Sequence, residues 1–207
     1  MLKGKFIVFE GIDGSGKSTQ SALLYNKLCS MDIKSHKTFE PTNRPIGSLL
    51  RKYLKGELSC DKKVLAGLFA SDRLDHYLND EDGIIKQVNN GVTVVCDRNY
   101  MSNFAYQADE DEDFVPSLNE KVRGMLKPDA HVFIDVSIDE ALDRIAKNRE
   151  NIDIFENKKA LTQIRENYKK YFEIFKNEEN IIIIDGNRSE QAISDEVFSK
   201  LSHLFDV

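Results

Sequence analysis

The sequence has few of the residues that build disulfide-rich, metal-binding or membrane-spanning proteins. Its cysteines, Cys29, Cys60 and Cys96, are an odd number without Cys-x-x-Cys spacing, which favours free thiols in a reducing compartment. The four histidines are scattered, so we expect no structural zinc site. No apolar stretch approaches the roughly 18 residues of a membrane span, and the polar start before the first apolar run is too short for a signal peptide. We therefore expect a cytoplasmic protein with no membrane partner.

Acidic residues outnumber basic ones, 35 to 29. The net charge of −6 argues against a protein that coats nucleic acid, and we expect no nucleic-acid partner. The chain has 207 residues, 41% of them hydrophobic, which suits one α/β domain with a substantial core. We predict a single domain over residues 1–207. The acidic run Asp109–Asp113 is interpreted as a solvated loop.

The most informative feature present is a glycine-rich loop. Residues 11–18 read Gly-Ile-Asp-Gly-Ser-Gly-Lys-Ser and match the phosphate-binding pattern in full, between an apolar run and a helical pattern that begins at Lys17. Glycines let the backbone N–H groups turn inward, and the following helix directs its positive end at the same point. Lys17 can reach the β- and γ-phosphates, and Ser18 can offer a hydroxyl to Mg²⁺. The predicted triphosphate-binding residues are Gly11, Ile12, Asp13, Gly14, Ser15, Gly16, Lys17, Ser18 and Thr19.

Apolar, β-branched runs alternate with helical patterns along the chain. Strands are predicted at Lys5–Glu10, Lys34–Phe39, Thr93–Asp97, His131–Val136 and Ile181–Asp185. Helices are predicted at Lys17–Met31, Ile46–Leu54, Asp61–Leu78, Ile84–Asn89, Leu118–Met125, Ile138–Arg149, Lys158–Lys176 and Glu190–Leu204. The alternation predicts an α/β fold, with a doubly wound, five-stranded parallel sheet between helical layers. Ligands of such sheets bind at the carboxyl ends of the strands.

One predicted strand ends in an acid that is followed by an arginine. Asp97 is placed to act with Ser18 near Mg²⁺, and Arg98 can bind an oxyanion at the same edge. A surface ion pair at a strand end is the alternative.

Several further segments, taken with the loop, resemble one kinase family. They are Phe9–Gln20, Glu40-Pro41 with Ile46-Gly47 and Arg51, Leu68–Arg73 with His76, Asp97-Arg98 with Ser102 and Ala105–Gln107, Pro128-Asp129 with Phe133–Val136, and Arg149 with Asp153 and Phe155-Glu156. Together they resemble thymidylate kinase, over about residues 5–185. The resemblance implies the P-loop nucleoside monophosphate kinase fold with a lid at about residues 144–156. It also implies transfer of the γ-phosphate of ATP to dTMP, a Mg²⁺ cofactor and a homodimer.

The resemblance also implies roles for individual residues. The acceptor-binding residues would be Glu40, Arg51, Phe69, Arg73, Asp97, Arg98, Asn103, Tyr106 and Gln107. Phe69 would stack on thymine, Arg73 would donate to a pyrimidine carbonyl and Tyr106 would crowd out a 2′-hydroxyl. From the residues alone, Phe69 or Tyr106 could equally fill core and Arg73 could be a solvated arginine.

The catalytic residues implied are Lys17, Arg98, Arg149 and Asp13. Asp13 would hold the sugar 3′-hydroxyl or a Mg²⁺-bound water. Residues 12–15 contain no basic side chain, so the lid must supply one. Arg149 is the predicted clamp, with Lys147 and Arg144 as substitutes, and a solvated helix end is the alternative.

Some positions depart from the commoner bacterial pattern. Phe39 stands where an arginine often precedes Glu-Pro, and Arg44 or Arg51 could replace its contact with the acceptor phosphate. Ala108 and Ile154 replace a frequent glycine and a frequent second lid arginine. A kinase for another nucleoside monophosphate or a deoxynucleoside is therefore an alternative. A second alternative is a P-loop switch, although the sequence has no Asn-Lys-x-Asp guanine-reading segment. The dimer contact could be Lys17–Met31 or the apolar face of Asp61–Leu78.

Overall fold

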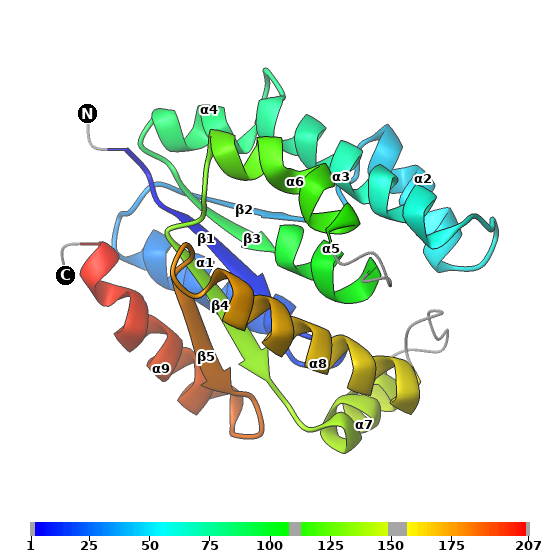
Figure 1. Cartoon of the computed structure of the whole chain (residues 1–207). Coiled ribbons are helices and arrows are strands. Elements are labelled where there is room, and N and C mark those ends of the chain that lie inside the picture. Colours follow the sequence, from blue (N-terminus) through cyan, green and yellow to red (C-terminus); the bar gives the residue numbers. More distant parts are fainter. Residues whose placement is uncertain (1–2, 108–112, 149–156, 206–207) are drawn as a thin grey trace.

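The computed structural model describes residues 3–107, 113–148 and 157–205. In this part of the chain five strands form one parallel sheet in the order β2-β3-β1-β4-β5 (Figure 1). The strands are β1 (Phe6–Glu10), β2 (Ser35–Phe39), β3 (Thr93–Asp97), β4 (Ala130–Asp135) and β5 (Ile181–Asp185). Each lies within a residue of its predicted bounds. The predicted parallel α/β fold is confirmed.

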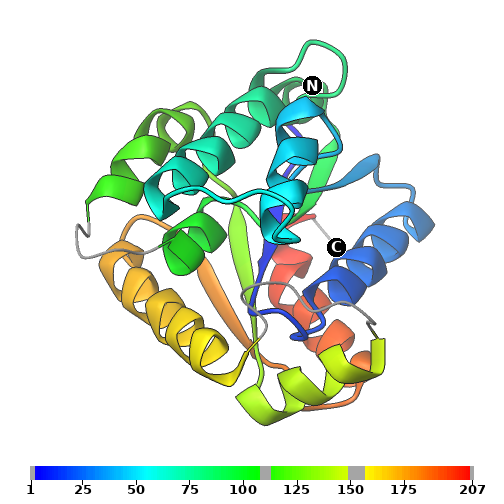
Figure 2. The same ribbon diagram turned by 90° about the vertical axis from the view of Figure 1, so that its right-hand side faces the viewer.

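Helices cover both faces of the sheet. They are α1 (Lys17–Ser30), α2 (Pro45–Leu54), α3 (Lys62–Leu78), α4 (Ile84–Asn89), α5 (Tyr100–Gln107), α6 (Phe114–Met125), α7 (Ile138–Asn148), α8 (Lys158–Phe175) and α9 (Glu190–Leu201), and a short 3₁₀ turn follows at Ser202–Leu204. Helices α1 and α9 pack on one face, whereas α3 to α6 and α8 lie on the other (Figure 2). Among the described residues, no helix is both long and apolar enough to cross a bilayer.

The core lies on both sides of the central strands. Strand β1 is buried along its whole length, and β3 and β4 are buried at all but their last residue. A strand covered on both faces needs apolar side chains at successive positions, which explains the continuous apolar runs in the sequence. The edge strands β2 and β5 are only partly buried.

Helix α9 ends at Leu201, three residues before its predicted end, and two helices differ more from the prediction. Helix α5 was not predicted, because seven of its eight residues are buried and it therefore has no polar face with helical spacing. Helix α6 begins at Phe114, four residues before the predicted start at Leu118. Pro116 argued against a helix at this point in the sequence. A proline is nevertheless tolerated in the first turn, because the first N–H groups of a helix have no partner within the helix.

Each strand ends at or just before an acidic residue. These residues are Glu10, Glu40, Asp97, Asp135 and Asp185. The register aligns Phe39 and Phe9 with Asp97, so the carboxylates after three neighbouring strands lie at one edge of the sheet. The phosphate-binding loop follows β1 at this edge, and the surroundings of these carboxylates define the site.

Candidate active site

The loop after β1 lines a cavity of about 420 Å³. Its walls are Asp13, Gly14, Ser15, Gly16, Lys17, Ser18, Thr19, Gln20, Arg144, Ile145, Arg188, Glu190 and Ile193. Gly14 and Gly16 have φ values of 76° and 91°, which a side chain would strain. A Cβ at Gly14 would also lie 2.3 Å from the Ala141 carbonyl oxygen. Of the predicted loop residues, Gly11 and Ile12 are not among the walls, and Ile12 is instead part of the core.

Lys17 is held inside this loop. Its ammonium donates to the Ile12 carbonyl at 3.3 Å and lies 3.6 Å from a carboxylate oxygen of Asp13. Burial lowers the pKa of Lys17, and the nearby Arg98 lowers it further, while Asp13 opposes the shift. The lysine is therefore poised beside a cavity where an anionic ligand would stabilise its charged form.

Ser18 and Asp97 meet between β1 and β3, as predicted for a metal site. The Ser18 hydroxyl donates to Oδ2 of Asp97, and Oδ1 is buried with no hydrogen-bond partner among the described residues. A hydroxyl and an incompletely bonded carboxylate are the hard oxygen ligands that Mg²⁺ prefers. The two residues therefore fit this ion.

Arg98 has the most constrained backbone of the candidate residues. Its φ is 70°, unusual for a residue other than glycine. The guanidinium donates to Asp13 Oδ1 at 2.6 Å, to the Tyr106 hydroxyl at 3.0 Å and to the Gly11 carbonyl at 3.2 Å. Burial opposes the charge, but Tyr106 and Asp13 raise the pKa of Arg98 well above its usual value. Arg98 thus remains a fixed cation.

Glu10 positions this arginine, a role that the sequence analysis did not predict. It is fully buried and accepts hydrogen bonds from the Asn99 backbone, the Ser102 hydroxyl and the Tyr168 hydroxyl. Ser102 in turn accepts from Arg98 at 3.1 Å. Burial raises the pKa of Glu10, and the hydrogen bond from Ser102 opposes the shift. The signal available in the sequence was an acid at the end of an otherwise apolar strand.

A second cavity of about 280 Å³ opens on the other side of Asp13. Its walls are Asp13, Phe39, Glu40, Pro41, Arg51, Leu54, Phe69, Arg73, Arg98, Asn99, Ser102, Asn103, Tyr106 and Gln107. The structure therefore brings together all the predicted acceptor residues except Asp97. Phe69 is half-buried against this cavity, which favours the stacking role over a core role.

Asp97 instead lines a third cavity of about 310 Å³ with Lys17 and Ser18. Asp13 and Arg98 also line this space, and both line the second cavity as well.

The polar groups of Arg73 and Asn103 are largely hydrogen-bonded to other side chains of the protein. Arg73 donates to Glu40 from Nε at 2.9 Å and from Nη2 at 2.8 Å, and its Nη1 donates to Asn103 and Asn119. Glu40 also accepts from His76 and Asn99, and the Asn103 amide donates to Gln107. The arginine is thus buried rather than solvated, and this network builds the wall of the second cavity.

Gln107 differs from its neighbours in this network. Its Oε1 accepts from Asn103 at 3.1 Å, but its buried Nε2 has no hydrogen-bond partner among the described residues. A buried donor without a partner is unfavourable, so a ligand that supplies an acceptor would relieve the cost.

Of the two candidates to compensate for Phe39, Arg51 is the one at the cavity. It donates to the Pro41 carbonyl at 2.9 Å and lines the second cavity. Arg44 instead pairs with Asp75 and Asp82 outside that cavity.

The start of the predicted lid is described only as far as residue 148. Arg144 donates to Glu140, to the Ser15 carbonyl at 3.2 Å and to the Gly186 carbonyl at 2.9 Å. It thereby joins the phosphate loop to the loop after β5, and Lys147 is exposed. The predicted clamp Arg149, with Asp153, Ile154 and Phe155-Glu156, lies outside the described residues, as do Ala108 and residues 109–112.

Comparison with known proteins agrees with this geometry. The family model described as thymidylate kinase matches residues 9–197. A probable thymidylate kinase of Methanocaldococcus jannaschii is 39% identical over 207 residues, covering 99% of both chains. A probable thymidylate kinase of Methanococcus aeolicus is also 39% identical, over 95% of both chains. A thymidylate kinase of Brachyspira hyodysenteriae is 36% identical, over 97% of this chain and 94% of its own. The chain belongs to the thymidylate kinase family.

Proposed function

We propose that this chain transfers the γ-phosphoryl group of ATP to the phosphate of dTMP and releases ADP and dTDP. The observation that carries the proposal is the pair of cavities that share Asp13, which pairs with Arg98 in the wall of the second cavity. The first cavity has the glycine loop and Lys17, which suit a triphosphate. The second has Phe69, Tyr106 and Gln107, which suit a small planar base on a sugar.

The acceptor side needs no general base. The second pKa of a phosphate monoester is about 6, so the attacking oxygen is already largely ionised at neutral pH. The work left for the protein is to align the two phosphates and to balance their charge. Arg98 would hold the acceptor phosphate, and Arg51 adds a second cation at the same wall.

The donor side is built for the triphosphate. The loop amides and Lys17 would bind the β- and γ-phosphates. Ser18 and Asp97 would hold Mg²⁺, which would supply further positive charge to balance that of the phosphates. Asp13 would orient Arg98 and Lys17, since it contacts both at 2.6 Å and 3.6 Å.

Two further parts of the proposal extend beyond these cavities. We propose Arg149 as the lid cation that stabilises the transferred group, because residues 12–15 carry no basic side chain.

We also propose a homodimer that uses α3. Val64, Leu74 and Leu78 on α3 are 53%, 39% and 51% exposed, whereas none of the exposed large apolar side chains of the described residues lies on α1. Light scattering of the wild type and of Leu78→Glu tests this contact, and a monomeric wild type would contradict it.

An acceptor panel tests the reaction itself. ADP formation is measured with ATP and Mg²⁺ in the presence of dTMP, dUMP or thymidine. Strict dependence on a nucleoside monophosphate, with dTMP the best acceptor, is the expected result. Phosphorylation of thymidine but not of dTMP would indicate a deoxynucleoside kinase, and ATP consumption without an acceptor would indicate a different class of P-loop protein.

A further inference from the structure

The first cavity, which we propose holds the phosphoryl donor, extends beyond the phosphate loop to the start of α9. Its walls there are formed by Gln20, Arg188, Glu190 and Ile193, and Arg144 also lines this cavity. Because the loop takes the phosphates, the nucleoside half of the donor must occupy this remaining space. Its polar groups are therefore the ones that can distinguish one donor base from another.

Gln20 has an incompletely bonded amide at this wall. Only 3% of its surface is exposed, and its Nε2 donates to the Glu190 carbonyl at 3.0 Å. A carbonyl can only accept, so this bond fixes which end of the amide carries the oxygen. The Oε1 atom that remains is buried and has no hydrogen-bond partner among the described residues. A buried acceptor without a partner is unfavourable, so a donor from a ligand or a water molecule would relieve the cost.

We propose that Gln20 determines the specificity for the donor base, with its Oε1 accepting a hydrogen bond from the exocyclic amino group of adenine. Adenine presents an N–H donor at this position of the ring, whereas guanine and hypoxanthine present a carbonyl oxygen. Two acceptors facing each other would repel, so 6-oxo purines bind less tightly. The inference rests on the proposed use of this cavity for the phosphoryl donor.

A purely structural role for Gln20 makes a different prediction. If the residue only ties α1 to α9, the Nε2 bond to Glu190 is what matters and the Oε1 atom is dispensable. Two substitutions separate these roles. Gln20→Glu keeps an acceptor and removes the donor, whereas Gln20→Lys keeps a donor for Glu190 and removes the acceptor.

The experiment compares the binding of ADP and IDP by calorimetry, and the turnover of ATP and ITP at saturating dTMP. For the wild type we expect ADP to bind about tenfold more tightly than IDP, as expected for one buried hydrogen bond. Gln20→Glu should keep this ratio, and Gln20→Lys should reduce it to about one. Because both ligands carry the same phosphates, the effect of an added charge on phosphate binding cancels in the ratio.

The exposed residue Gln163 on α8 provides the control, and Gln163→Lys should bind like the wild type. Thermal unfolding confirms that the variants fold, and Gln20→Leu replaces Gln20→Lys if the latter does not. A wild type without preference, or a Gln20→Lys or Gln20→Leu variant that keeps it, would overturn the inference. Failure of the proposed function is distinguishable, because dTMP phosphorylation would then be absent whatever the ratio of ADP to IDP binding.

Discussion

Asp13 and Arg98 are 85 positions apart in the sequence, yet their side chains form an ion pair at 2.6 Å, and Asp13 lines both the first and the second cavity. Asp13 comes from the loop after β1 and Arg98 from the turn after β3, and these two strands are neighbours in the sheet. The other Asp13 oxygen accepts from Tyr106 at 3.0 Å. One carboxylate therefore links the phosphate loop to the proposed acceptor site.

Replacement of Arg98 by lysine should damage the acceptor side while keeping its charge. Lysine cannot reproduce the planar set of bonds to Asp13, Tyr106 and Gly11. We expect kcat/KM for dTMP to fall by about 10²–10³, the usual effect of losing one positioned donor, while ADP binding changes little. Steady-state kinetics and calorimetry measure the two effects. Unchanged dTMP kinetics would show that Arg98 does not bind the acceptor.

Lys17→Ala tests the donor side. It removes the cation that would neutralise the β- and γ-phosphates, so turnover should fall by roughly two or more orders of magnitude. Exposed Lys27 on the same helix gives the matched control, and Lys27→Ala should retain wild-type turnover. Near-normal activity of Lys17→Ala would refute the donor assignment.

Gln107→Met should weaken the recognition of the base. Arg73 and Asn103 are already bonded within the protein, whereas Nε2 of Gln107 awaits an acceptor such as a pyrimidine carbonyl. Methionine has a similar volume and no N–H group, so we expect KM for dTMP to rise about tenfold with a smaller change in kcat. An unchanged KM would show that thymine does not use this amide.

The limits of the sequence are visible in these same residues. The glycine loop and the strand ends follow from local pattern, and both lie where they were predicted. Helix α5 could not be predicted, because a helix buried on all sides shows no periodicity. The pairing of Arg73 with Glu40 depends on residues 33 positions apart, and the structure was needed to show that this arginine is buried. Local pattern marks Glu10 only as an acid at the end of an apolar strand, because its partners, like those on which the proposed role of Gln20 rests, come from distant elements.

Arg149→Ala tests the proposed lid cation, which lies outside the described residues. A residue that contacts only the transferred group should affect kcat more than dTMP affinity, and we expect kcat to fall by about 10²-fold or more. Arg144→Ala is the comparison, because Arg144 holds the Ser15 and Gly186 carbonyls and should therefore affect ATP binding as well. If Arg149→Ala weakens only dTMP binding, the residue belongs to the acceptor side.

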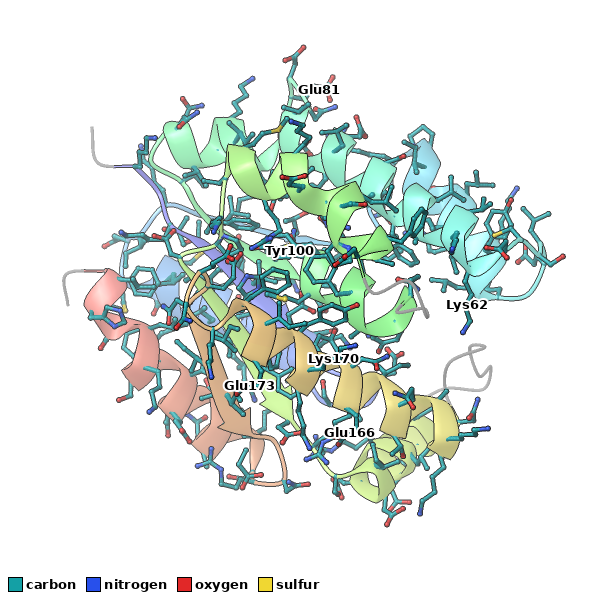
Figure 3. All side chains as sticks on the ribbon, viewed as in Figure 1. Lys62, Glu81, Tyr100, Glu166, Lys170 and Glu173 are labelled. Atoms are coloured by element: carbon teal, nitrogen blue, oxygen red, sulfur yellow. The ribbon has the colours of Figure 1, made fainter. Side chains whose placement is uncertain are left out.

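Stability at low pH should depend on Glu179, which lines none of the three cavities. It accepts from the Tyr100 hydroxyl at 2.9 Å and from Arg123 at 2.9 Å, and it lies 3.5 Å from His131. Tyr100 is in the interior between the sheet and the covering helices (Figure 3). Burial opposes the charge of Glu179, but His131, Arg123 and Tyr100 lower its pKa to about 2.

Because the pKa of Glu179 is lower in the folded state, its contribution is complete above the ordinary value of 4.5 and is lost as the pH falls towards 2. At pH 7, Glu179→Gln should reduce the free energy of unfolding by about 3 kcal/mol, since it leaves the largely buried Arg123 poorly paired. The neighbouring Glu178 also contacts Arg123 but is 55% exposed, so Glu178→Gln should cost less than about 1 kcal/mol. Urea unfolding at pH 7, 5 and 3.5 measures both, and the wild type should lose its advantage over Glu179→Gln only below about pH 4.5. An advantage that is constant across this range would mean that the carboxylate charge contributes nothing to the fold.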